Sequence, residues 1–338
     1  MTASALILGC SGLVLTPEEK GFFRDVDPWG FILFKRNCDE PEQVRALVSS
    51  LRDAVGRADA PVLIDQEGGR VQRLKPPYWP SYPAGRPFGA VFSHDPDRAR
   101  RCLFNVTRLI AKDLHDLGIT VDCMPVLDVP VPGAHDVIGD RAYASDPETV
   151  AILGRVVCEA LLAGGVLPVI KHVPGHGRAG VDSHLSLPRV DAARERLASS
   201  DFAPFKALAD MPLAMTAHVV YSALDPDRPA TTSPTMIGDI IRGELAYDGL
   251  LMTDDLSMQA LDGPLGKRIS QSIAAGCDVG LHCNGSMAEM VELAAVAPKL
   301  DGDALRRARA ALARLEPPAP FDQDQAFADL AAMMGESV

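Results

Sequence analysis

Residues 171–188, KHVPGHGRAGVDSHLSLP, concentrate side chains that can transfer protons. They hold Lys171, Asp182 and three of the eight histidines of the chain, namely His172, His176 and His184. Their prolines and glycines exclude a continuous helix or strand and indicate a mobile loop. The preceding residues 165–170 form an apolar run typical of a buried strand. We therefore expect Lys171 and His172 at the carboxyl end of a strand, where α/β proteins bind their ligands.

Asp182 and His184 are separated by one residue, so a turn can fold the carboxylate back onto the imidazole. A neighbouring carboxylate fixes the tautomer of a histidine and raises its pKa, which suits acid–base catalysis. A lone Asp-X-His is more often a capping aspartate beside a surface histidine, but the nearby K-H and G-H-G groups favour a reactive site. A metal site built from the three histidines is an alternative, which the flexible glycines disfavour.

The rest of the chain alternates short apolar runs with longer amphipathic ones, which predicts an α/β fold. Eight strands are expected, at residues 5–8, 30–34, 61–64, 119–124, 166–170, 212–218, 249–253 and 278–282. Helices are expected after Thr16 and at residues 40–55, 95–117, 146–163, 191–208 with a break near Pro204, 237–245, 286–297, 303–315 and 323–334. Residues 76–88 show no usable periodicity.

Ionisable groups recur at the carboxyl ends of these strands. They are Asp65 and Arg73, Arg141, Lys171 and His172, His218, and Asp254. Because only a closed ring brings so many strand ends to one point, we predict a single (β/α)8 TIM-type barrel with loop insertions at its rim. It forms one domain over residues 1–338, with 316–338 as a loosely attached peripheral tail. A doubly wound sheet is the alternative, but no G-X-G-X-X-G follows the first strand and no nucleotide phosphate loop is present.

Asp254 and Asp255 both follow the strand at residues 249–253, and strand alternation places their side chains on different sides. We expect Asp254 to face the barrel mouth as a nucleophile or electrostatic stabiliser, and Asp255 to cap a helix that begins near Leu256. An ionised carboxylate opposite an aspartate-supported histidine suggests displacement on a polyhydroxylated substrate. Glycoside hydrolysis with retention fits, although its second group is usually also a carboxylate.

Charge and composition exclude several classes of protein. The chain has 338 residues, with 33 basic against 45 acidic side chains and a net charge of -12, which disfavours nucleic acid and anionic membranes as partners. Its seven cysteines are scattered without a C-X-X-C pair, which indicates a reducing compartment. The first residues lack the basic region of a signal peptide, and no apolar run is long enough to span a membrane. We therefore expect a cytoplasmic protein.

Five ordered segments resemble family 3 glycoside hydrolases of the bacterial β-N-acetylglucosaminidase type. They are DQEGGRVQR, PVLDV with IGDR, KHVPGHG with DSH, MTAHV, and TDDLSM. The resemblance implies a (β/α)8-type barrel and a retaining mechanism without metal or organic cofactor. It further implies that a cytoplasmic enzyme removes terminal N-acetylglucosamine from 1,6-anhydro-N-acetylmuramic acid fragments, with or without peptide, during peptidoglycan recycling. We expect a monomer.

The resemblance also assigns roles by motif. Asp254 matches the nucleophile, His184 the general acid/base, and Asp182 the carboxylate that orients this histidine. The residues that match the family's sugar-binding positions are Asp65, Arg73, Arg141, Lys171 and His172. His176 has no catalytic counterpart and is expected to hold the loop by hydrogen bonding. A phosphorylase, a metal-dependent amidohydrolase and a non-catalytic sugar-binding protein remain alternatives.

Overall fold

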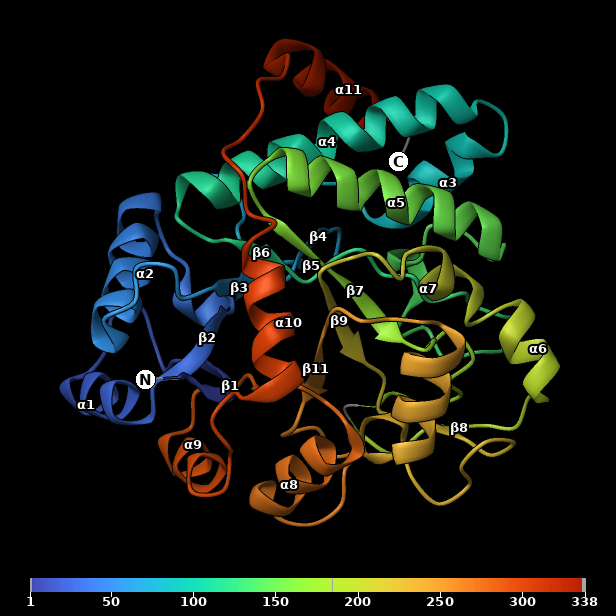
Figure 1. Ribbon diagram of the computed structural model, residues 1–338. Coiled ribbons are helices and arrows are strands. Elements are labelled where there is room, and N and C mark those ends of the chain that lie inside the picture. The colour runs from blue at the N-terminus through green and yellow to red at the C-terminus, as the bar shows by residue number, and fades with distance from the viewer. Residues whose placement is uncertain (1, 184, 336–338) are drawn as a thin grey trace.

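The computed structural model describes residues 2–183 and 185–335. Within them, eight parallel strands close a barrel in the order β1-β12-β11-β9-β7-β6-β3-β2 (Figure 1). These strands are β1 (Ser4–Gly9), β2 (Pro28–Leu33), β3 (Val62–Ile64), β6 (Val121–Asp122), β7 (Leu167–Val173), β9 (Leu213–Thr216), β11 (Leu250–Asp255) and β12 (Val279–His282). Each of them overlaps one of the expected apolar runs, so the predicted barrel is confirmed.

An outer layer of helices surrounds the strands (Figure 1). It consists of α1 (Pro17–Val26), α2 (Pro41–Val55), α4 (Pro96–Asp116), α5 (Pro147–Ala163), α7 (Ala203–Ala207), the π-helix η4 (Met236–Glu244), α8 (Leu265–Ala275) and α9 (Met287–Ala294). The first four begin with proline, which lacks the N–H that a first helical turn leaves unpaired. Thr16 and Glu19 form a capping box at the start of α1, with hydrogen bonds of 3.1 and 2.8 Å.

Shorter elements lie in the loops between the barrel strands and helices. They are η1 (Lys35–Asn37), the hairpin β4 (Gln66–Gly68) and β5 (Val71–Gln72), α3 (Gly85–Phe92), η2 (Gly139–Arg141), the pair β8 (Arg189–Val190) and β10 (Val220–Tyr221), α6 (Arg194–Ser199) and η3 (Ala230–Thr232). The helix expected at residues 191–208 is in fact two helices, α6 and α7. Its break lies at residues 200–202 because Pro204 is tolerated in the first turn of α7.

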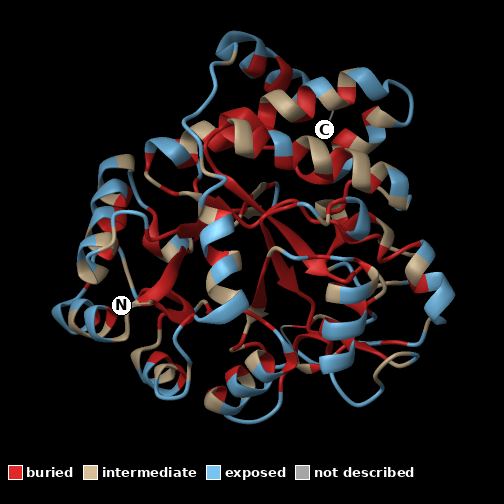
Figure 2. Ribbon diagram, viewed as in Figure 1, coloured by how far each residue is buried: buried red, intermediate tan, exposed pale blue. Residues whose placement is uncertain are grey.

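Alternate side chains of each strand face the barrel interior and the helices. In β2, Ile32 belongs to the interior cluster, whereas Phe31 and Leu33 pack outward against the helices. Strands buried on both faces read as continuous apolar runs, which is why they could be recognised. The buried strands and the exposed outer faces of the helices are visible in Figure 2.

Helix α10 (Gly302–Leu312) closes the amino-terminal end of the barrel. Leu300, Ala308 and Ala311 belong to the interior cluster, and α10 lies across the strands in Figure 1. Arg307 fixes the helix by donating to Asp278 at 3.0 Å and to Asp248 at 2.9 Å. Within the described residues the amino-terminal end of the barrel is therefore covered, which leaves the carboxyl ends of the strands for a ligand.

The C-terminal helix α11 (Gln323–Gly335) lies outside the barrel and packs against α4 (Figure 1). Ala326, Leu330 and Met333 are buried there, and Asp329 accepts a 2.7 Å hydrogen bond from Asn105. The expectation of a loosely attached tail was therefore wrong, because this helix contributes to the hydrophobic core. None of the helices in residues 2–183 and 185–335 has both the length and the apolar character that crossing a membrane requires.

Candidate active site

A cavity of about 390 Å³ opens at the carboxyl ends of the barrel strands. Six predicted site residues line it together, namely Asp65, Arg73, Arg141, Lys171, His172 and Asp254. Apolar side chains at the ends of the inner strand faces, including Ile32, Met215 and Leu281, also line it. The barrel thus brings together groups that lie as much as 189 positions apart in the sequence, as the repeated polar strand ends predicted.

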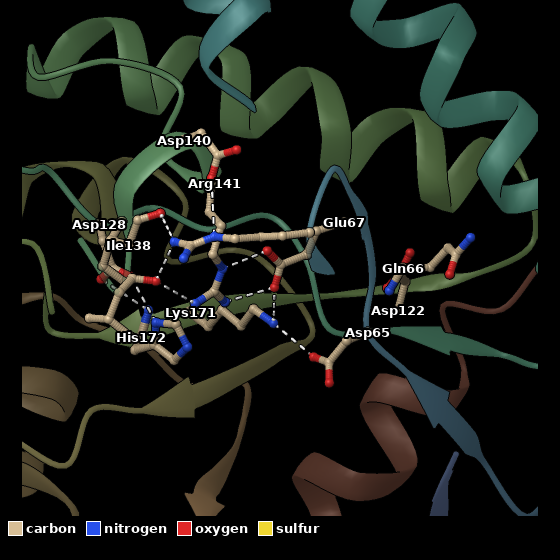
Figure 3. A network of polar contacts seen from close by, with 12 residues as sticks. Asp65, Gln66, Glu67, Asp122, Asp128, Ile138, Asp140, Arg141, Lys171 and His172 are labelled. Atoms are coloured by element: carbon tan, nitrogen blue, oxygen red, sulfur yellow. Dashed lines mark hydrogen bonds and ion pairs between the residues drawn. The ribbon is translucent and has the colours of Figure 1, made fainter. Parts of the chain in front are cut away.

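Lys171, at the end of β7, is the centre of a buried ion network on one wall of the cavity (Figure 3). Its Nζ donates to Asp65 Oδ1 at 2.9 Å and also contacts Glu67 Oε1. Glu67 in turn receives two 2.8 Å hydrogen bonds from Nε and Nη2 of Arg141. This paired contact fixes the plane of the Arg141 guanidinium, and Arg141 lines the cavity.

The acidic and basic side chains of this network stay ionised at neutral pH. Burial alone raises the pKa of Glu67, but the adjacent Arg141 and Lys171 outweigh it and lower that pKa to about 2. Burial opposes ionisation of Asp65 as well, yet Lys171 and Arg73 hold its pKa well below the usual range. The same contacts raise the pKa values of Lys171 and Arg141 against the effect of burial. The wall therefore presents oriented, permanently charged donors and acceptors.

Asp65 also positions Arg73. Its second oxygen accepts a 2.9 Å hydrogen bond from Arg73 Nη2, so one carboxylate orients two cations. The guanidinium of Arg73 lies over the ring of Phe34, 4.9 Å from the centroid. Phe34 lines the cavity too, and it gives the Arg73 side of the pocket an aromatic surface.

Asp128 is a buried carboxylate behind the cavity wall that holds two histidines. Oδ2 binds Nδ1 of His172 at 2.7 Å, while Oδ1 accepts the backbone N–H of His172 at 3.3 Å and of His176 at 2.6 Å. Burial raises the pKa of Asp128, but His172 outweighs it and lowers that pKa to about 2. Because Nδ1 is held by an ionised carboxylate, Nε2 is the nitrogen that His172 can offer to a ligand.

Asp254 and Asp255 end β11, and both line the cavity. Oδ1 of Asp254 accepts the N–H of Asp255 at 2.8 Å. Asp255 binds the hydroxyl of Ser257 at 2.6 Å and the N–H of Cys283 at 3.2 Å. The prediction that Asp255 caps a helix near Leu256 was wrong, because α8 begins only at Leu265. Asp255 instead stabilises the turn that follows Asp254.

His218 lies next to this strand end but does not line the cavity. It is fully buried, with Nδ1 at 2.7 Å from Thr231 Oγ1 and Nε2 at 3.1 Å from the carbonyl of Asp255. Burial lowers its pKa, although Asp254 opposes this. Both ring nitrogens are engaged, so His218 supports the end of β11.

The loop after β7 is more firmly held than its glycines suggested. His176, Gly177 and Ala179 are buried. A Cβ on Gly177 would lie 2.1 Å from the carbonyl oxygen of Val129, so this glycine permits close packing rather than motion. Asp182 is half-buried, and its carbonyl accepts the N–H groups of residues 185 and 186. His184, the predicted acid/base, lies outside the described residues.

Sequence reasoning missed the roles of Glu67 and Asp128. Both lie in segments already marked as functional, D-Q-E-G-G and P-V-L-D-V. A carboxylate two residues after Asp65 in a strand-end loop was the available signal for Glu67. Among the residues that the structure describes, no three His, Cys, Asp or Glu side chains are arranged to hold a metal ion.

This chain resembles known proteins in both sequence and structure. Residues 20–315 match the family described as glycosyl hydrolase family 3 N terminal domain. A beta-hexosaminidase of Alkalilimnicola ehrlichii is 42% identical over 288 residues, covering 84% of this chain and 82% of that protein. A beta-hexosaminidase of Pseudomonas aeruginosa is 37% identical and covers 86% of each chain. The crystal structure of NagZ from Neisseria gonorrhoeae in complex with N-trifluoroacetyl-D-glucosamine is similar with a TM-score of 0.89, at 30% identity and 98% coverage of both chains.

Proposed function

The chain belongs to family 3 of the glycoside hydrolases, and on this basis we propose that it is a retaining exo-β-N-acetylglucosaminidase with Asp254 as its nucleophile. The observation that carries the proposal is the cavity in which Asp254 meets Asp65, Arg73, Arg141 and Lys171. Its volume of about 390 Å³ lies at the small end of ligand pockets. Because the barrel beneath it is filled, the cavity suits the terminal sugar of a chain.

Asp254 attacks the anomeric carbon in the first step of the proposed reaction. As the C1–O bond to the leaving group breaks, His184, oriented by Asp182, transfers a proton to the departing oxygen. In the second step the same histidine takes a proton from water, the oxygen of that water bonds to C1, and the carboxylate of Asp254 is released. Two displacements on one carbon return the original β configuration.

Sugar recognition is proposed to rest on the charged wall. Asp65 accepts hydrogen bonds from sugar hydroxyls, while Arg73, Arg141 and Lys171 donate to hydroxyl and acetamido oxygens. His172 adds Nε2 at the edge of the same cavity. These contacts orient C1 toward Asp254, and orientation of this kind lowers the barrier without any covalent contribution.

We infer that the physiological substrate is N-acetylglucosaminyl-1,6-anhydro-N-acetylmuramic acid, bare or peptide-bearing, and that the enzyme serves peptidoglycan recycling as a cytoplasmic monomer. The proposal is supported by the motif resemblance and by the ligand of the neisserial structure, which is an N-acylglucosamine analogue. Light scattering in solution tests the monomer, for which the expected mass is 36.0 kDa.

The nucleophile is tested with Asp254→Ala on p-nitrophenyl N-acetyl-β-glucosaminide. We expect kcat to fall by at least about 1,000-fold, because the substitution removes the carboxylate that forms the covalent intermediate. Asp262→Ala, at an exposed aspartate eight positions later, is the matched control and should keep the parental rate. In the wild type, a fluorinated glycoside that slows the second step should label the peptide containing Asp254. Parental turnover by Asp254→Ala would overturn the assignment.

Product analysis separates hydrolysis from its alternatives. Proton NMR on the anhydromuramyl disaccharide should show β-N-acetylglucosamine as the first product, with and without inorganic phosphate. A glycosyl phosphate would identify a phosphorylase, and an initial α-anomer would exclude retention. Loss of activity after chelation would favour a metal-dependent amidohydrolase.

A further inference from the structure

His176 makes a contact that the proposed chemistry does not use. Its ring lies against that of His172, with centroids 5.7 Å apart and an interplanar angle of 61°. Its backbone N–H donates to Asp128, and its Nε2 lies 3.0 Å from the hydroxyl of Ser183. The contacts of His176 therefore run from the sugar-binding wall to the residue between Asp182 and His184.

Ser183 is a buried anchor in an exposed stretch of loop. Its residue exposure is 3%, whereas Val181 and Leu185 on either side are exposed by 41% and 70%. A short polar side chain turned inward between two exposed apolar ones is unfavourable unless its hydrogen bond compensates. The Ser183 contact with His176 thus determines how this part of the loop meets the barrel.

The surroundings of the His176 imidazole determine which ring nitrogen carries the proton. Nδ1 of His176 is buried and has no hydrogen-bond partner within residues 2–183 and 185–335. A proton on Nε2 makes a hydrogen bond to Ser183 Oγ, whereas no side chain among the described residues accepts a hydrogen bond from Nδ1. Burial lowers the pKa of His176 to about 4, so the ring is neutral in this arrangement. We assign the Nε2–H tautomer, which donates to the serine.

We propose that His176 is a positioning residue, whose hydrogen bond to Ser183 fixes the Asp182 segment relative to the sugar-binding wall and so sets the efficiency of acid catalysis. The inference rests on the proposed function. It also accounts for Asp128, because one ionised carboxylate then fixes both the sugar-facing His172 and the base of the acid/base loop.

Two amide variants separate this role from general packing. The Nε2 of glutamine can reach the position of the histidine Nε2–H, whereas the amide of asparagine is too short. On substrates whose leaving group needs protonation, we expect His176→Gln to keep most of the activity and His176→Asn to lose most of it. Ser183→Ala removes the acceptor with little change of volume, so it should match His176→Asn. The double variant should be no worse than either single one, because both remove the same hydrogen bond.

The discriminating measurement is kcat/KM over aryl N-acetyl-β-glucosaminides that range from 2,4-dinitrophenyl to unsubstituted phenyl. A dinitrophenolate departs without protonation, whereas phenolate needs the acid. We expect His176→Asn and Ser183→Ala to lose at least about 10-fold on the phenyl glycoside but less than about 3-fold on the dinitrophenyl one, within the range of general acid catalysis. Thermal melting of each variant excludes loss of folding.

Asp182→Ala is the reference that separates failure of this inference from failure of the proposed function. If it too leaves the leaving-group dependence unchanged, the acid/base assignment itself is wrong. The other outcome is that Asp182→Ala steepens this dependence while His176→Asn and Ser183→Ala lower kcat/KM equally on all substrates. In that case the positioning role is wrong and the proposed function stands. Equal rates for His176→Gln and His176→Asn would also overturn the positioning role.

Discussion

Buried carboxylates in this barrel differ in charge because their neighbours differ. Asp65, Glu67 and Asp128 each face a cation or a histidine, which outweighs the cost of burial and keeps them ionised. Asp122 is buried more deeply than Asp65 and Glu67, and within the described residues its carboxyl group accepts a hydrogen bond only from the N–H of Gln66, at 3.0 Å. Burial therefore dominates and raises the pKa of Asp122 to about 8.

Asp122 should make the enzyme less stable as pH rises. The pKa of Asp122 is higher in the folded than in the unfolded protein. Its stabilising contribution to the free energy of unfolding is therefore fully present below about pH 4 and is lost as pH approaches 8. We expect Asp122→Asn, which keeps an oxygen for Gln66 without the charge, to raise the free energy of unfolding at pH 7.5 by about 1–3 kcal/mol. Urea titrations at pH 5 and 7.5 measure the difference.

Asp122→Asn should raise the free energy of unfolding much less at pH 5 than at pH 7.5. Asp122→Ala is the control, since it removes the charge but also leaves the N–H of Gln66 unpaired, and it should be destabilising at pH 5. An equal effect of Asp122→Asn at both pH values would show that this carboxyl does not titrate in the folded protein.

The residue types of the site could be predicted from sequence, but their partners could not. A strand that ends in Lys171 and His172 identifies groups at the barrel mouth whatever the loops do. Which carboxylate orients which cation depends on loop geometry that carries no periodic signal. For that reason Asp65 was predicted as a sugar ligand, whereas the pairing of Glu67 with Arg141 became evident only in three dimensions.

Predictability of the elements follows their length and burial. The barrel strands are continuous apolar runs, and capping groups such as Thr16 and Asp146 mark the starts of the helices. The barrel strands β3 and β6 are equally short but lie within apolar runs, whereas β4, β5 and β8 contain the polar residues Gln66, Glu67, Gln72 and Arg189 and so give no such signal. Helix α3 was missed because it begins within the proline-rich stretch 76–88.

The packing of α11 on α4 predicts that the C-terminal helix stabilises the barrel. Leu330 is 7% exposed in this interface, whereas Phe327 on the same helix is 48% exposed. We expect Leu330→Ala to lower the free energy of unfolding by about 2–4 kcal/mol through lost burial and a residual cavity. Phe327→Ala should change it by less than about 1 kcal/mol despite removing a larger side chain. Urea denaturation measures both, and equal small effects would restore the view of a loosely attached tail.

At the scale of the whole molecule, closure of the barrel joins the two ends of the sequence. β1 pairs with β12, with Leu6 opposite Gly280, so the sheet cannot close until nearly the whole barrel has been made. Helix α10 then fills the amino-terminal end and leaves the cavity at the other. Repeated polar strand ends predicted the closure, but nothing in the spacing of residues 303–315 showed that this helix would cover the barrel floor.

We therefore expect the barrel to unfold as one domain, which its two tryptophans can test from opposite ends. Trp29 lies near the start of β2 in the interior cluster, and Trp79 lies in the rim loop that follows β5. Both are at most 6% exposed, so the fluorescence of each reports loss of its own surroundings. In Trp29→Phe the remaining signal comes from the rim, and in Trp79→Phe it comes from the floor.

Each variant should give the same urea midpoint by fluorescence as by far-ultraviolet circular dichroism, because a closed barrel cannot lose one end and keep its strand pairing. The comparison is made within each variant, so a change in stability from the substitution itself does not affect it. A rim signal that melts at lower urea than the secondary structure would show that the loops around the cavity unfold independently. The site would then be assembled on a separate, weaker unit rather than on the barrel itself.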